Sequence, residues 1–182
     1  MKAGQVIRSF NSENGQRVIL RAPKWEDLDD LLDLINSLVE EKADIFRAEK
    51  VTRVEEIDWL SKMLAGLEKD EFYFIVAEVN GKVIASSDLH PQHGYDKHVG
   101  VIGIVIKKGF RDIGIGTEIM KTHVKQAMKS GLKVLTLSAF TTNDRAIHLY
   151  KKIGFAETGR VPRKHLRDGQ FIDEVIMTML LE

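Results

Sequence analysis

The feature that most constrains the fold is a short glycine-containing stretch between two elements of different periodicity. Residues 111–116 read Arg-Asp-Ile-Gly-Ile-Gly, and they lie between the apolar, β-branched run 99–106 and a helical pattern from about Thr117 to Lys129. Glycine allows tight turns and close approach of other atoms to the backbone. A strand that passes through such a turn into a helix predicts helices packed on a sheet, because the helix must bury its apolar face there.

The remaining elements follow from periodicity and turn chemistry. Helical spacing predicts helices over 26–41 and 52–67, the second with Thr52 as N-cap and Glu55 completing a capping box. Asn80-Gly81 predicts a hairpin turn between two strands. The predicted strands are 17–21, 72–79, 82–89, 99–106, 134–139, about 156–161 and about 174–181, with a last helix over 143–153 and a turn at 168–169. Segment 42–51 fits either a helix or a loop.

Length and element order indicate one domain over residues 1–182. No repeat, low-complexity tract or Pro/Gly/Ser linker divides the chain. A meander of three strands before a strand–helix–strand crossover predicts a mixed sheet. The expected fold is therefore of class α/β (α+β), with a mostly antiparallel sheet of six to seven strands flanked by helices.

Composition excludes several function classes. Lys plus Arg and Asp plus Glu number 27 each, so no global field favours nucleic acid. No apolar run approaches the roughly 20 residues that cross a bilayer, and residues 1–16 lack the apolar centre of a secretory signal, so we expect a cytoplasmic protein without a membrane partner. The absence of cysteine excludes disulfides, thiolate metal sites and a cysteine nucleophile.

The glycine stretch is also a candidate anion site. The first amides of a helix have no intrahelical partners, and the helix dipole adds partial positive charge. Thr117 either caps this helix or donates its hydroxyl to the same anion. A plain strand-to-helix turn is the alternative. Two other nucleotide motifs do not fit, since no lysine follows Gly116 as in a P-loop and Ile119 occupies the place of the third glycine of a dinucleotide fingerprint.

A second motif lies downstream, where residues 143–155 read Asn-Asp-Arg-Ala-Ile-His-Leu-Tyr-Lys-Lys-Ile-Gly-Phe. Its apolar residues also fit the inward face of an ordinary amphipathic helix. Together, however, the two motifs resemble the signatures of the GNAT superfamily of N-acetyltransferases. Arg111, Gly114 and Gly116 match Gln/Arg-x-x-Gly-x-Gly/Ala, whereas the downstream signature is matched by Asn143, Ala146, Leu149, Tyr150, Gly154 and Phe155.

The resemblance implies a splayed sheet and transfer of an acetyl group from acetyl-coenzyme A, as co-substrate, to a primary amine in a ternary complex. Residues 113–117 would hold the pyrophosphate, residues 104–106 would pair with the pantetheine arm, and Arg145 would meet the adenosine phosphates. Tyr150 would act as the general acid. The implied cofactor-binding residues are Ile104, Val105, Ile106, Arg111, Asp112, Ile113, Gly114, Ile115, Gly116, Thr117, Asn143 and Arg145, and the implied catalytic residues are Tyr150 and Asn143.

The general base is the part of the site that the sequence leaves open. Many family members place a glutamate in or beside the strand that matches residues 98–106, and here that segment contains no carboxylate. The candidates are Asp88, His90, His93 and His98 near one turn, and Glu40 and Glu41 at the end of a helix. A solvated loop explains the histidines equally well, and no carboxylate–histidine pattern predicts a metal site.

The C-terminal stretch 159–176 is similar to the branch that contains ribosomal-protein N-terminal and related amine acetyltransferases, through Gly169, Phe171 and Asp173. A hairpin with a turn glycine is the alternative explanation. The acceptor stays open between a protein N-terminus, a lysine, a polyamine and a small amine, and the family habit allows a homodimer. The rival function is a non-catalytic coenzyme A-binding sensor or partner-binding domain on the same fold.

Overall fold

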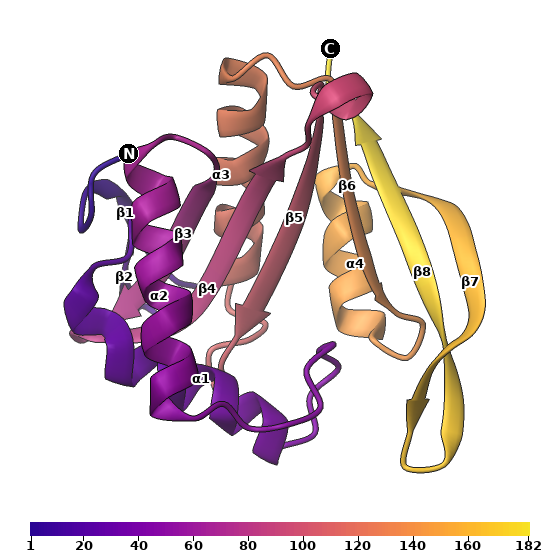
Figure 1. The fold of residues 1–182 in the computed structure, drawn as a ribbon, viewed down its shortest axis with the longest axis horizontal. Coiled ribbons are helices and arrows are strands. Elements are labelled where there is room, and N and C mark those ends of the chain that lie inside the picture. Colours follow the sequence, from indigo (N-terminus) through magenta and orange to yellow (C-terminus); the bar gives the residue numbers. More distant parts are fainter.

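A computed structural model describes all 182 residues, and its eight strands form one sheet in the order β1-β2-β3-β4-β5-β6-β8-β7 (Figure 1). All neighbouring strands are antiparallel except β5 and β6, which confirms the mixed, mostly antiparallel sheet. The strands are β1 (Val6–Asn11), β2 (Arg17–Arg21), β3 (Tyr73–Val79), β4 (Lys82–Pro91), β5 (Val99–Ile106), β6 (Val134–Phe140), β7 (Ala156–Arg167) and β8 (Gln170–Leu180).

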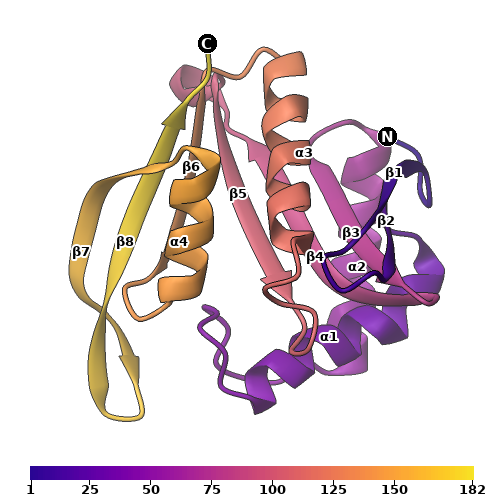
Figure 2. The ribbon, with the colours of Figure 1, turned by 180° about the vertical axis from the view of Figure 1, so that it is seen from behind.

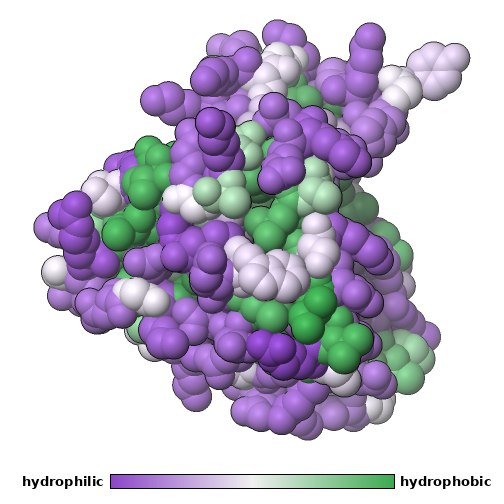
Figure 3. Space-filling model, turned by 60° about the vertical axis from the view of Figure 1, so that its left-hand side comes forward, coloured by the Kyte–Doolittle hydropathy of each residue, from purple (hydrophilic) through white to green (hydrophobic).

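Four α-helices cover the two faces of the sheet. In Figure 1, α1 (Leu28–Glu40) and α2 (Arg53–Glu68) lie in front of the sheet, whereas Figure 2 shows α3 (Ile115–Lys129) and α4 (Asp144–Ile153) on the opposite face. Leu34 and Leu38 of α1 belong to a buried apolar cluster on one face, whereas Ile119 and Met120 of α3 belong to two further clusters on the other. The face of the molecule shown in Figure 3 is mainly hydrophilic, and many of its hydrophobic side chains gather toward the middle.

Several local predictions are confirmed. Thr52 caps α2 by accepting from the amide of Glu55, whose carboxylate accepts from the amide of Thr52 in return. Asn80 and Gly81 both have positive φ, as a tight hairpin between β3 and β4 requires. Segment 42–51 contains no helix, so it is a loop between α1 and α2.

The structure differs from the predicted elements at three places. Strand β1 was not predicted, because five of its six residues are exposed and it lies at the edge of the sheet. Helix α3 begins at Ile115, two residues before the predicted start, with Gly114 as N-cap. The final hairpin is longer than predicted, because β7 and β8 continue their pairing as far as the turn at Asp168 and Gly169.

The sheet splits between its two parallel strands. The strands β5 and β6 pair only through residues 99–101 with 134–136. Beyond Val101, β5 pairs with β4 alone, and β6 pairs with β8 alone. Figures 1 and 2 show the two strands diverging from this point. The fold therefore presents one edge of β5 inside the molecule, with backbone groups that no neighbouring strand uses.

One buried ion cluster holds the first helix against the sheet. The guanidinium of Arg21 on β2 donates to both carboxylate oxygens of Asp27 at 2.7 Å and to Glu78 of β3 at 2.7 Å. Arg21 and Asp27 are both buried, and Asp27 lies in the short 3-10 helix (Trp25–Asp27) that leads into α1. The cluster thus fixes where α1 begins relative to the sheet.

Asp27→Ala should lower the free energy of unfolding by about 3–5 kcal/mol, because it leaves a buried guanidinium without its main partner. Asp29→Ala is the matched control, since Asp29 pairs with Arg53 on the surface and exposed pairs contribute little. Chemical denaturation of both variants measures the difference. Equal stability of the two variants would contradict a structural role for the buried cluster.

Candidate functional site

The divergence of β5 and β6 opens into a cavity of about 1230 Å³. Its walls come from segments that are far apart in the sequence, namely the α1–α2 loop, β4, β5, the glycine loop before α3, the end of β6 and helix α4. Both sequence motifs therefore meet at one place, although a whole helix and a whole strand separate them along the chain. The cavity is the candidate functional site.

The glycine loop forms an anion cradle at one end of the cavity. Gly114 has φ +86°, which only glycine adopts without strain, and this turn directs the chain into α3. The amides of Ile115, Gly116 and Thr117 donate no hydrogen bond within the protein, whereas Glu118 is the first residue whose amide bonds back into the turn. These free amides and the helix dipole fit a phosphate.

The two glycines of the loop have different roles. A β-carbon on Gly116 would lie 3.0 Å from Leu149 and 3.2 Å from Ile106, so Gly116 allows α3 to pack closely against α4 and β5. A β-carbon on Gly114 would instead approach the carboxylate of Glu13, at 3.3 Å from the loop between β1 and β2. Gly114 therefore allows the turn that forms the cradle, whereas Gly116 allows the helix after it to pack closely against its neighbours.

The charged residues of the motif are used inside the protein. Arg111 donates to the carbonyl of Ile106 at 2.8 Å and pairs with Glu41, so it joins the end of β5 to the end of α1. Asp112 pairs with Arg145 of α4 at 3.1 Å. Arg111, Asp112 and Arg145 all line the cavity, but each already has a protein partner.

Tyr150 lies in α4 with its ring in the core and also lines the cavity. Its ring packs beside Phe155, and its hydroxyl makes no hydrogen bond to the protein. Burial raises the pKa of Tyr150 to about 12. The phenol therefore stays protonated across the neutral range, which is the state that a proton donor needs.

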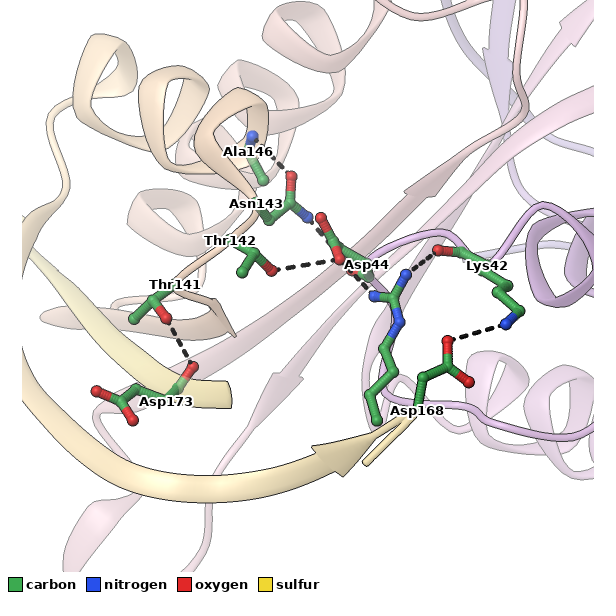
Figure 4. Close-up of polar contacts among 9 residues, drawn as sticks. Lys42, Asp44, Thr141, Thr142, Asn143, Ala146, Asp168 and Asp173 are labelled. Carbon is green, nitrogen blue, oxygen red and sulfur yellow. Dashed lines mark hydrogen bonds and ion pairs between the residues drawn. The ribbon is translucent and has the colours of Figure 1, made fainter. Parts of the chain in front are cut away.

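Asn143 has two protein partners, which the sequence did not reveal. Its side-chain oxygen caps α4 by accepting from the amide of Ala146 at 3.2 Å, and its amide group donates to the carbonyl of Asp44 at 3.2 Å. Figure 4 shows Asp44 in the α1–α2 loop reaching toward Asn143 and Thr142. In this structure Asn143 therefore fastens that loop to the start of α4.

Arg167 at the end of β7 completes this connection and was not predicted to belong to the site. Its guanidinium donates to the carboxylate of Asp44 at 2.6 Å and to the carbonyl of Lys42, whereas Lys42 pairs with Asp168 at 2.8 Å. Lys42, Asp44 and Arg167 all line the cavity. We call these contacts of Lys42, Asp44, Asn143, Arg167 and Asp168 the loop clasp, because they hold the α1–α2 loop across the open end of the sheet.

The six candidates for the general base differ in whether they line the cavity and in whether they already have a charged partner. Glu40 pairs with exposed Lys50, and Glu41 pairs with Arg111. His93 and His98 flank the short 3-10 helix η2 (Gly94–Asp96) after β4, at the end of β5 opposite the glycine loop, and neither lines the cavity. Among the six candidates, Asp88 alone lines the cavity, and it contacts His90.

The comparisons with known proteins agree with this geometry. The model of the acetyltransferase (GNAT) family matches residues 31–155, which include both motifs and most of the cavity. The chain belongs to this family. It is therefore an acetyltransferase that uses acetyl-coenzyme A as co-substrate and an amine as acceptor, which argues against the alternative of a non-catalytic binding domain.

Individual relatives cover most of the chain. The putative phosphinothricin acetyltransferase YwnH of Bacillus subtilis is 26% identical over 161 residues, which are 87% of this chain and 96% of that protein. An N-alpha-acetyltransferase of Sulfurisphaera tokodaii is 32% identical over 115 residues, 57% of this chain and 68% of that protein. The crystal structure of a GNAT-family acetyltransferase from Streptococcus pneumoniae has 26% identity and a TM-score of 0.79, covering 90% of this chain and 99% of that one.

The site residues fit acetyl-coenzyme A in chemistry. The cradle supplies free amides for a pyrophosphate, and the open edge of β5 supplies peptide groups for an extended, amide-containing arm. No cluster of three or more His, Asp or Glu side chains could bind a metal ion, and no helix combines the length and hydropathy needed to span a bilayer.

Gly114→Ala should weaken coenzyme A binding about tenfold or more, because alanine at φ +86° costs roughly 1–2 kcal/mol and the loop relaxes by tilting the cradle amides. Gly109→Ala is the matched control. Gly109 has φ +89° in the same loop but does not line the cavity, so it carries the same backbone cost away from the cradle. Calorimetric titration of both folded variants measures the affinity, and equal weakening in the two would remove the cradle from the binding site.

Proposed function

We propose that the chain transfers the acetyl group directly to the amine while both substrates are bound in the cavity, with Tyr150 as the proton donor to the departing sulfur. The observation that carries this proposal is the placement of one protonated, unpaired phenol in the wall of the cavity. A thiolate that leaves in a poorly hydrated site needs a nearby acid. The absence of cysteine is consistent with a reaction that forms no covalent enzyme intermediate.

The proposed cofactor contacts follow the geometry of the cavity. The amides of residues 114–117 hold the pyrophosphate, and the backbone of residues 104–106 pairs with the pantetheine arm along the free edge of β5. A strand amide in the same segment stabilises the oxyanion that forms on the acetyl group. For Asn143 we propose an indirect role: it positions the α1–α2 loop, because both ends of its side chain already have protein partners.

The acceptor is proposed as a primary amine of amino-acid or N-terminal type. The names of the two curated relatives support this class, one being a putative phosphinothricin acetyltransferase and the other an N-alpha-acetyltransferase. The direct test measures thiol release from acetyl-coenzyme A with phosphinothricin, with free L-amino acids and with a short peptide bearing a free N-terminus. Spermidine and N-α-blocked lysine serve as acceptors outside the proposed class. Turnover confined to those two would overturn it.

Tyr150→Phe should lower kcat by about 10²- to 10⁴-fold and leave coenzyme A affinity unchanged. Phenylalanine keeps the ring and its packing in the core, so only the proton donor is removed. Tyr95→Phe is the matched control, because Tyr95 is fully exposed in η2, outside the cavity. The measurements are kcat at saturating substrates and the melting temperature. If Tyr150→Phe turns over within about threefold of the parent, Tyr150 is a packing residue and the proposed proton donor is wrong.

A further inference from the structure

Asp88 and His90 lie two residues apart on β4 and therefore point to the same face of the sheet, the face that α1 and α2 cover. One carboxylate oxygen of Asp88, Oδ2, contacts Nε2 of His90 at 2.7 Å. Asp88 lines the cavity, whereas His90 does not. Asp88 therefore faces the cavity, and His90 lies outside it.

The other carboxylate oxygen of Asp88 occupies space that a glycine leaves free. Gly103 on β5 is the direct cross-strand partner of Asp88. A β-carbon on Gly103 would lie 2.9 Å from Oδ1 of Asp88, closer than real β-carbons approach an oxygen. The φ of Gly103 is not in the left-handed region, so the backbone does not require glycine there. Because Gly103 has no side chain, the Asp88 carboxylate can lie directly against the backbone of β5.

Both partners of Asp88 are held in place by buried neighbours. The hydroxyl of Ser87 donates to the carbonyl of Gly103 at 2.7 Å and contacts Nε2 of buried His123 at 2.9 Å, which ties this point of β5 to α3. The ring of Phe72 lies 4.7 Å from the His90 ring. Phe72 can take this position because Gly66 of α2 leaves room for its ring. The geometry of the pair is therefore determined by the core on both faces.

The charges around Asp88 leave its free oxygen without a cationic partner. The neighbouring strands present Phe74 from β3 and Gly103 from β5, both uncharged. Burial lowers the pKa of His123 to about 4, so this histidine is neutral near pH 7. Across the cavity, the Lys42 and Arg167 cations are paired within the loop clasp. On α2, buried Glu56 has Arg47 as its interacting charge.

We propose that Asp88 is the group that accepts the proton of the attacking amine, and that His90 positions it by donating from Nε2 to Oδ2. The inference rests on the proposed function and names the base that β5 itself lacks. As the nitrogen–carbon bond forms, one proton leaves the nitrogen for Oδ1 of Asp88, and the bond to sulfur breaks with its electron pair remaining on sulfur. Tyr150 protonates that sulfur. The Asp88 side chain is itself 36% exposed, so the accepted proton has a path to water.

The first test uses Asp88→Asn and Asp88→Ala with phosphinothricin and the free-N-terminus peptide as acceptors. Both variants should lose about 10²- to 10⁴-fold in kcat with coenzyme A affinity unchanged. Formate should restore part of the rate of Asp88→Ala, because it fills the space of the lost carboxylate. His93→Gln, outside the cavity, should behave as the parent.

Two further variants test the geometry. Gly103→Ala should reduce turnover with little change in melting temperature, because the added methyl group displaces only the Asp88 carboxylate. His90→Gln should lose less rate than Asp88→Asn, because glutamine can still donate a hydrogen bond to the carboxylate. Nitrogen-15 spectra give a readout independent of activity: His90 should carry its proton on Nε2 in the parent and lose that preference in Asp88→Ala.

The outcomes separate the two hypotheses. If the parent releases no thiol with any amine, the proposed function is wrong and the inference with it. If the parent is active and folded Asp88→Asn retains turnover within about threefold, Asp88 is not the proton acceptor and only the inference is overturned. A rate loss in Asp88→Ala without formate rescue would reduce Asp88 to a structural residue and would also overturn the inference.

Discussion

The separation of two parallel strands is the constraint on which the rest of the structure depends. Strands β5 and β6 share only three residue pairs, and beyond them each strand bonds to a different neighbour. Peptide groups inside a protein require partners, so a sheet that stays open needs supports on both sides. Helices α3 and α4 pack against the diverging strands on one face, and the loop clasp connects the two sides at the open end. The cavity and its chemistry follow from this opening.

Charge inside the cavity is distributed in a way that suits transfer to an amine. The cradle before α3 carries free amides, and the one acidic residue of its loop, Asp112, is paired with Arg145, whereas Asp88 lines the cavity from β4. The Lys42, Arg111 and Arg167 cations are neutralised by carboxylates from other elements. The two ends of the opening thus differ in character: one suits an anion, and the other retains a carboxylate that has no cationic partner on its inner oxygen.

Local patterns made much of the fold predictable. The Asn80-Gly81 turn, the capping box at Thr52 and the glycine loop each depend on residues close in sequence, and the structure confirms all three elements. Strand β1 escaped prediction because its order comes from pairing with β2 at a solvent-exposed edge, not from an apolar pattern. Edge strands carry little of the alternation that burial imposes.

In the candidate site, too, features formed by residues close in sequence could be predicted, whereas contacts between distant residues could not. The glycine loop before α3 could be predicted, because all of its residues are adjacent. The N-cap position of Asn143 is also local, but its second partner, Asp44, lies 99 residues away in a loop without periodicity. The shared face of Asp88 and His90 follows from their spacing in a strand. That Gly103 lies opposite Asp88 depends on the register between β4 and β5, which the spacing alone does not determine.

The open sheet also has a thermodynamic consequence. Any molecule that binds between β5 and β6 supplies contacts that a continuous sheet would have formed within the chain. Such a molecule binds the folded state and not the unfolded chain, so it raises the free energy of unfolding by an amount that grows with the logarithm of its concentration, about 2.7 kcal/mol at one hundred times its dissociation constant. The resistance of this chain to heat and proteolysis is then set in part by the supply of its own substrate.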